Sequence, residues 1–145
     1  MTPAEIHVAG FAELTPAVLH GILRLRQEVF VVEQGCPYRD IDGRDAEQDA
    51  QHLWFEHEGQ VVGALRLLRD IDGAHRIGRV VTDPHHRGQG LAGALVYHAI
   101  SLAGPPLVLS AQAHLQSWYE RYGFSVCGDT WVEDGITHVP MRRDA

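Results

Sequence analysis

The stretch RVVTDPHHRGQGLA at residues 79–92 decides the fold, because it contains in order a strand, a turn and the start of a helix. Its β-branched residues favour a strand, and apolar residues at helical spacing follow over Leu91–Leu102. Gly88 and Gly90 bring main-chain N–H groups to the start of that helix, where these donors lack intrahelical partners and lie at the positive end of the helix dipole. We therefore expect an anion at this turn, and a pyrophosphate is its natural ligand.

The charges around the turn support an anion site. Residues 84–119 contain no Asp or Glu, although the chain has 19 acidic residues in total. Arg87 carries the only formal charge in that span, and its guanidinium can join the main-chain donors in holding phosphate oxygens.

Two other interpretations of the turn remain open at this point. The spacing Gly88-x-Gly90-x-x-Gly93 satisfies the dinucleotide fingerprint, but that fingerprint expects its first glycine directly after the strand and an acidic residue about 20 positions later. Here several residues separate the strand from Gly88, and no acidic residue appears before Glu120. Alternatively, the glycines only form a tight connection between a strand and a helix.

Hydrophobic periodicity and turn residues divide the rest of the chain into short elements. The expected strands are Glu5–Val8, His52–Glu56, Val61–Leu68, Ile77–Thr82, Leu107–Leu109, Phe124–Cys127 and Thr137–Met141, the last two joined by Glu133-Asp134-Gly135. The expected helices lie near 16–32, over Leu91–Leu102 and from about Ala113 to Tyr122. This order, β-α-(α)-β-β-β-α-β-α-β-β, indicates an α/β or α+β domain with a mixed, mostly antiparallel sheet flanked by helices. No linker divides the chain, so we expect a single domain over residues 1–145.

Composition excludes several functions. All 12 basic residues are Arg, so a Schiff-base lysine, a pyridoxal-phosphate anchor and a Walker A lysine are absent from the sequence. A formal net charge of -7 argues against a nucleic-acid partner. No stretch approaches the roughly 20 apolar residues of a membrane span, and no signal peptide precedes the first strand, so we expect a cytoplasmic protein without membrane contact.

No metal is expected either. Cys36 and Cys127 are too few for a thiolate site and are interpreted as reduced thiols. Asp40, Asp42 and Asp45 have a spacing similar to that of a calcium loop, but a glycine falls between the second and third acidic residues and no terminal Glu fits.

Two motifs in this order resemble one enzyme superfamily. The pattern Arg87-x-x-Gly90-x-Ala92 after a strand resembles the acetyl-CoA motif Arg/Gln-x-x-Gly-x-Gly/Ala of the GCN5-related N-acetyltransferases (GNAT). About 30 residues later, WYERYGF at 118–124 is similar to that superfamily's Leu-Tyr-Glu-Lys-x-Gly-Phe segment. Most of the chain further resembles the ElaA-like branch, whose substrate is not settled. The matching positions are 24–26, 29–34, 36–38, Asp40, Asp42, Gly43, His52-Leu53, 133–136, His138 and Met141.

The resemblance implies that acetyl-CoA is the co-substrate and that an amine attacks its thioester directly, without an acyl-enzyme. The pantetheine arm is expected to lie along residues 80–82, in the position of an additional strand. The diphosphate is expected to lie in the turn at 87–92. Gln112 occupies the place of an asparagine that often holds the cofactor. The implied cofactor-binding residues are Val80, Val81, Thr82, Arg87, Gly88, Gln89, Gly90, Leu91, Ala92 and Gln112.

Catalysis needs a proton acceptor, since a primary amine with a pKa of about 10.4 is almost fully protonated at neutral pH. Glu33 and His52 are the candidate bases because the superfamily's acceptor groove lies beside their elements. The alternatives are an ordinary carboxylate at a helix end and a core histidine. By its motif position Tyr119 is the expected general acid, and the alternative is a packed aromatic residue on an amphipathic helix.

The acceptor is expected to be a small-molecule or peptide amine. Acidic residues concentrated in 40–49 suggest a cationic one, with Asp42 and His52 as substrate ligands, although a solvated acidic loop is an equally good interpretation. A CoA-binding regulatory or interaction module without turnover is the alternative function. The resemblance is compatible with a monomer or a homodimer.

Overall fold

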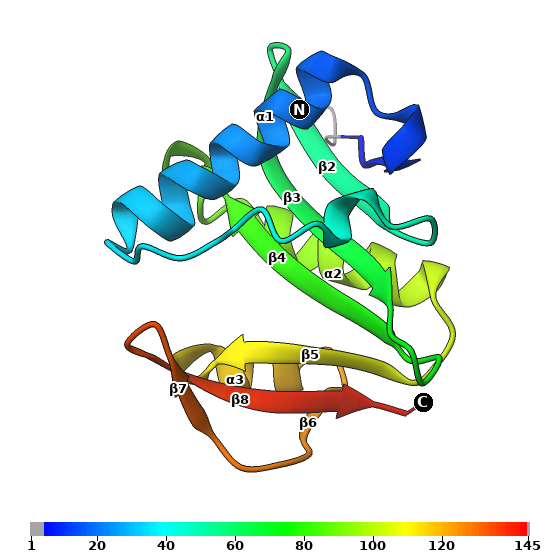
Figure 1. Ribbon diagram of the computed structural model, residues 1–145, viewed down its shortest axis with the longest axis vertical. Coiled ribbons are helices and arrows are strands. Elements are labelled where there is room, and N and C mark those ends of the chain that lie inside the picture. The colour runs from blue at the N-terminus through cyan, green and yellow to red at the C-terminus, as the bar shows by residue number, and fades with distance from the viewer. Residues whose placement is uncertain (1–4, 145) are drawn as a thin grey trace.

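A single mixed sheet forms the frame of the protein, of which the computed structural model describes residues 5–144. The sheet has eight strands in the order β1-β2-β3-β4-β5-β8-β6, and β7 pairs with β8 outside this path (Figure 1). All pairs are antiparallel except β4 and β5, which run parallel. The strands are β1 (His7–Gly10), β2 (Gln51–His57), β3 (Gln60–Arg69), β4 (His75–Thr82), β5 (Leu107–Gln112), β6 (Ser125–Val126), β7 (Trp131–Glu133) and β8 (Ile136–Arg143).

Within the described residues, three α-helices cover the sheet. The helix α1 (Pro16–Arg26) begins after Thr15, whose hydroxyl accepts the N–H of Val18 at 3.2 Å, with a proline at the first helical position. It lies on one face over β3 and β4, whereas α2 (Leu91–Leu102) and α3 (Gln116–Glu120) lie on the opposite face (Figure 1). A wider π-helix continues α1, and short 3-10 turns complete the helical segments at Phe11–Glu13, Arg44–Ala46, Pro84–His86 and Ala113–Leu115.

Each face of the sheet buries its own hydrophobic core. The larger core lies between the sheet and α2 and α3 and includes Leu53, Leu95 and Met141, none of which is measurably exposed. The smaller core lies under α1 and joins Ile22 and Leu25 to residues of β2, β3 and β4. Burial on both faces explains why β3 is almost continuously apolar instead of alternating.

A bulge in β4 opens the sheet at its centre. The pairing of β3 with β4 shifts register between Ala64 and Arg66, and opposite this shift Arg79 adopts a left-handed φ of 53°. The parallel pairing of β4 with β5 comprises only His75 with Leu107 and Arg76 with Val108. Beyond those residues the two strands diverge, as the separating arrows of Figure 1 show. Main-chain groups at the far end of β4 are therefore left without a neighbouring strand on that side.

The expected mixed, mostly antiparallel α/β architecture is confirmed, with three differences. The helix expected near 16–32 changes to a π-helix at Gln27–Glu33. The helix expected from about Ala113 begins as a 3-10 turn. The turn at 133–135 does not follow the strand at 124–127 but joins β7 to β8. β7 is only three residues long, too short for alternation to reveal it. Among residues 5–144, no helix is long and apolar enough to cross a membrane.

Candidate active site

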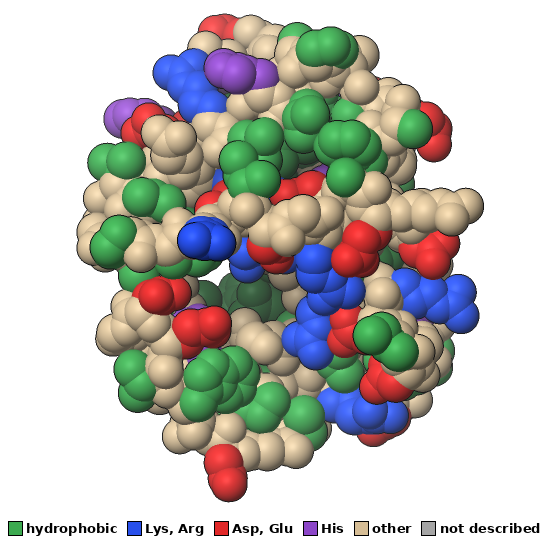
Figure 2. All heavy atoms as spheres, in the orientation of Figure 1, with side chains coloured by type: hydrophobic (Ala, Val, Ile, Leu, Met, Phe, Trp, Pro, Cys, Tyr) green, Lys and Arg blue, Asp and Glu red, His purple; other side chains and the backbone are tan. Residues whose placement is uncertain are grey.

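The diverging strands β4 and β5 enclose a large open cavity of about 1210 Å³. Figure 2 shows it as a hollow across the middle of the face that carries α1. One wall is formed by β4 and the turn before α2, and the other by β5, α3 and the β7–β8 hairpin. Nine of the ten residues implied to bind the cofactor line this cavity, Gln89 being the exception: Val80, Val81, Thr82, Arg87, Gly88, Gly90, Leu91, Ala92 and Gln112.

The turn before α2 has the geometry of an anion site. Gly88 and Gly90 both adopt left-handed φ angles, 80° and 77°, which other residues adopt at a cost. The side chain of Asp83 caps the preceding 3-10 turn by accepting the N–H of His85 at 2.8 Å. No side chain caps the start of α2, and its first turn holds no acidic residue. The first N–H groups of α2 are thus left for an external acceptor.

Arg87 is engaged by Glu33, which ends the π-helix. The two side chains form a bidentate pair with N–O distances of 2.6 and 2.8 Å, and both are more than two-fifths exposed. The hydrogen bond from Arg87 lowers the pKa of Glu33, and the bond to Glu33 raises the pKa of Arg87. In this arrangement Glu33 is a weak base and does not line the cavity, whereas Arg87 does.

Tyr119 of α3 lines the cavity and is 7% exposed. Its ring packs edge-on against Trp118, with centroids 4.9 Å apart, and against Phe124. Burial raises the pKa of Tyr119 to about 12. The phenol is therefore neutral and able to donate a hydrogen bond. Complete proton transfer to a thiolate of pKa about 8.5 is uphill by roughly 5 kcal/mol, so hydrogen-bond donation is its main contribution.

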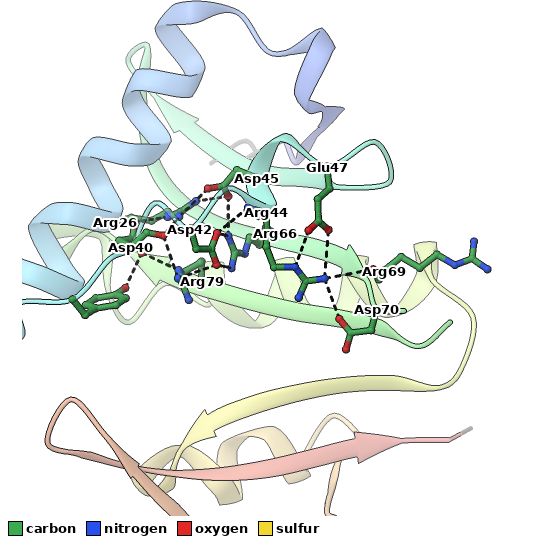
Figure 3. Close-up of polar contacts among 11 residues, drawn as sticks. Arg26, Asp40, Asp42, Arg44, Asp45, Glu47, Arg66, Arg69, Asp70 and Arg79 are labelled. Atoms are coloured by element: carbon green, nitrogen blue, oxygen red, sulfur yellow. Dashed lines mark hydrogen bonds and ion pairs between the residues drawn. The ribbon is translucent and has the colours of Figure 1, made fainter. Parts of the chain in front are cut away.

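The acidic segment before β2 is neutralised by arginines from three other elements (Figure 3). Arg26 of α1, 1% exposed, pairs with Asp40 at 2.8 Å and with Asp45 at 2.7 Å. Arg66 of β3 holds both carboxylate oxygens of Asp42, at 2.7 and 2.8 Å. Asp40, Asp42 and Asp45 are therefore engaged by arginines and are not the free carboxylates that the expected attraction of a cationic acceptor requires, whereas Asp49 of the same segment is exposed, as in the alternative of a solvated loop.

Arg79 of the β4 bulge completes this buried charge network. Its guanidinium pairs with Asp40 at 2.9 Å and with Asp42 at 3.4 Å. It also lies over the ring of Tyr38, 5.5 Å from the centroid, and the Tyr38 hydroxyl donates to Asp40 at 2.7 Å. These contacts tie the segment 38–45 to β4 and so fix the wall of the cavity above the bulge.

The pKa shifts of the network residues keep its carboxylates ionised and its tyrosine neutral. The hydrogen bond from Arg66 lowers the pKa of Asp42 well below its usual range. Burial raises the pKa of Asp45, but the hydrogen bonds and charges of Arg26 and Arg66 together outweigh burial, and the net shift is downward. Burial raises the pKa of Tyr38, and its bond to Asp40 adds to that effect.

Two expected substrate ligands have other roles. His52 is 1% exposed, does not line the cavity, and has its Nε2 2.9 Å from the carbonyl oxygen of Asp45. Burial also lowers the pKa of its imidazole, which keeps it a neutral core residue. Asp42 does line the cavity, but Arg66, Arg79 and the N–H of Arg44 already occupy its two oxygens. Neither residue is free to bind a substrate.

Sequence reasoning also missed several cavity residues. His138 of β8 lies opposite Gln112 of β5 in the sheet, and both line the cavity. Gln112 donates across the mouth to the side-chain oxygen of Gln34 at 3.4 Å. Tyr38 belongs to the ElaA-like resemblance and Arg79 begins the strand before the glycine turn, but no role was expected of either, because their contacts with Asp40 form only in the folded chain. His138 was part of the ElaA-like resemblance, and its alternation with the buried Val139 could have placed it on the cavity side.

Comparisons with known proteins agree with this geometry. A family model described as an acetyltransferase (GNAT) domain matches residues 18–145. A UPF0039 protein of Mycobacterium tuberculosis is 43% identical over 136 residues, which cover 90% of this chain and 87% of the relative. The protein ElaA of Escherichia coli is 36% identical over 140 residues, 92% of each chain.

Two crystal structures share the whole fold. An acyl-CoA N-acyltransferase from Pseudomonas aeruginosa superposes with a TM-score of 0.93 at 43% identity, covering 97% of this chain and 99% of that one. Escherichia coli ElaA superposes with a TM-score of 0.91 at 34% identity, covering 98% of this chain and 100% of that one. The chain therefore belongs to the GNAT acetyltransferase family, in its ElaA-like branch, and is an acyltransferase.

Proposed function

We propose that the protein is an acetyl-CoA-dependent N-acetyltransferase that moves an acetyl group directly to the amine of a small molecule or peptide. The observation that carries this proposal is the cavity between β4 and β5, which runs from the uncapped start of α2 to Tyr119. Family membership supports an acyl-CoA donor, and the superposed Pseudomonas aeruginosa protein is described as an acyl-CoA N-acyltransferase.

The residues at the turn fit the cofactor's diphosphate. A Cβ at Gly88 or Gly90 would meet nothing within 4 Å, so the space above both glycines is open to a ligand. The free N–H groups at the start of α2 and the guanidinium of Arg87 would hold the phosphate oxygens. Arg87 must exchange Glu33 for phosphate, so binding of the cofactor also releases that carboxylate.

The unpaired end of β4 supports the position of the pantetheine arm. Val80 and Thr82 lie beyond the last residue that pairs with β5, so their main-chain groups are available to an added strand-like ligand. A main-chain N–H of this segment is also suited to hold the oxygen on which charge develops. Bound acetyl-CoA supplies the thioester, and Tyr119 donates a hydrogen bond to the sulfur as it departs.

A positive charge on the acceptor is supported by acidic residues other than those expected from segment 40–49. With the network acids occupied, Glu133 and Asp134 are the acidic residues of the β7–β8 turn that line the cavity and are exposed. They support a cationic amine at the mouth, whereas Asp42 does not. The acceptor would approach over the turn and reach the bulge of β4.

A thiol-release assay separates an enzyme from a silent CoA-binding module. Acetyl-CoA should raise the melting temperature, and free CoA thiol should appear only when a primary amine is added; spermidine, lysine amide and dialanine are suitable probes. Binding without thiol release would favour the module, and no binding at all would refute both. Tyr119→Phe should lower kcat about tenfold and leave the calorimetric affinity for acetyl-CoA unchanged, because it removes only the hydrogen bond to the sulfur.

A further inference from the structure

We propose that His138 is the general base that removes the proton from the acceptor amine; this inference rests on the proposed function. The two bases expected from the sequence are unsuitable in this structure. Glu33 does not line the cavity and lies beside Arg87 at the diphosphate turn, so its release by the cofactor leaves it at that end of the site, and His52 is sealed in the core. The reaction still needs a proton acceptor near the diverging ends of β4 and β5.

The position of His138 follows from alternation along β8. Val139 and Met141 are buried in the core beside α2 and α3. Ile136, His138 and Pro140 therefore point to the opposite face of the sheet. α1 covers that face over β3 and β4, and Figure 1 shows no helix in front of β5 and β8 in the described chain. His138 thus lies on the accessible side of the cavity.

The hydrogen bond of the ring fixes which nitrogen can act. Nδ1 of His138 lies 2.9 Å from the carbonyl oxygen of Ile136. A carbonyl only accepts, so Nδ1 carries the proton, and the neutral ring presents the lone pair of Nε2. Trp131 stacks on the ring with centroids 5.6 Å apart and planes 20° apart, and its Nε1 donates to Glu133 at 3.4 Å. Main chain and neighbouring strand together hold the imidazole in one tautomer and one orientation.

The other histidines of the cavity lack this arrangement. His86 lies beside the phosphate turn, where its Nδ1 is 3.5 Å from Asp83. His114 is exposed on the 3-10 turn before α3, and no hydrogen bond to another described residue orients its ring. Among residues 5–144, His138 is the cavity histidine whose tautomer is set by the main chain.

His138 acts while the amine attacks the thioester carbon. As the amine nitrogen bonds to the acyl carbon, Nε2 of His138 takes a proton from that nitrogen. The carbon–sulfur bond breaks with its electron pair on sulfur, which Tyr119 stabilises by a hydrogen bond and which then takes a proton from water. The imidazolium returns its proton to water. One amine and one thioester thus give one amide and one thiol.

The test compares His138→Gln and His138→Ala with wild type in the thiol-release assay. His20→Gln, an exposed histidine on α1, is the matched control. With the most active of the three amine probes, His138→Gln should lower kcat by about 10²- to 10⁴-fold. It should also abolish the acidic limb of the pH profile. The affinity for acetyl-CoA and the melting temperature should stay near wild type, and added imidazole should restore part of the activity of His138→Ala.

Nitrogen-15 NMR of the wild-type imidazole gives an independent readout that needs no variant. In the neutral ring Nε2 should be unprotonated and Nδ1 protonated; the reverse tautomer would overturn the inference. It would also be overturned if His138→Gln kept the wild-type kcat and acidic limb. If wild-type protein released no thiol with any amine, the proposed function itself would fall, and this inference with it.

Discussion

Replacing Arg26 by methionine tests whether the buried charge network stabilises the fold through charge. Methionine keeps most of the apolar volume of the side chain, but it removes the partner that Asp40 and Asp45 share and leaves them with Arg79 and Arg66 alone. Removing one member of a buried ion pair typically costs about 3–5 kcal/mol. For a chain of this size, 1 kcal/mol corresponds to about 2–4 °C, so the melting temperature at pH 7 should fall by roughly 6–20 °C.

The pH dependence identifies the cause. In the wild type the pKa of Asp45 is lowered in the folded state, so its contribution is present above the unfolded pKa of about 3.9 and is lost as pH falls through the folded value. In the variant Asp45 keeps only its contact with Arg66, at 3.2 Å, so burial is less fully compensated and the pKa of Asp45 should lie above its wild-type value. Protonation of Asp45 then relieves part of the cost of the lost partner. The difference in melting temperature between the two proteins should therefore be largest at pH 7 and shrink towards pH 4.

Thermal unfolding followed by circular dichroism at pH 7, 5.5 and 4.5 measures this difference. Arg24→Met is the matched control, since Arg24 is an exposed arginine on the same helix. The control should stay within about 2 °C of wild type. The prediction is refuted if Arg26→Met has the melting temperature of the wild type. It is also refuted if the decrease in melting temperature is the same at all three pH values, which would indicate lost packing instead of lost charge pairing.

Two further substitutions probe the cofactor turn. Gly93→Ala should lower the free energy of unfolding by about 1–3 kcal/mol and weaken acetyl-CoA binding, because the added Cβ would overlap the Tyr122 hydroxyl and displace α2. Chemical denaturation and calorimetry measure the two effects. Gly104→Ala is the control for both, since a Cβ at that position meets nothing within 4 Å. Glu33→Gln should tighten acetyl-CoA binding a few-fold by freeing Arg87, as measured by calorimetry at low salt. Weaker binding would show instead that Glu33 holds Arg87 in place for phosphate.

The structure of the glycine turn, which is proposed to hold the cofactor, could be predicted because its signals are local. Gly88, Gly90 and the apolar run after them lie within a few residues of one another, and α2 spans Leu91–Leu102 as the periodicity predicts. Left-handed glycines and an uncapped helix start are properties of the chain itself. Arg87 and Tyr119 follow from the same two motifs, and the structure places both in one cavity.

The acceptor side could not be predicted because it depends on distant partners. Asp40 meets Arg26 across 14 residues and Arg79 across 39, so the composition of the segment alone suggested free carboxylates. The bulge at Arg79 arises from the pairing of β3 with β4, and no glycine marks the left-handed position itself. His138 acquires a defined tautomer only when the β8 main chain is folded.

The choice of arginine for every cation of the buried network has a chemical consequence. A guanidinium stays protonated at any pH the protein meets and is not acylated by a thioester, whereas the ε-amine of a lysine is a target for acetylation. The sequence contains no lysine. The ion pairs of Arg26, Arg66 and Arg79 that shape the cavity wall therefore survive contact with the reactive donor it is proposed to hold, and turnover cannot erode them by neutralising their charge.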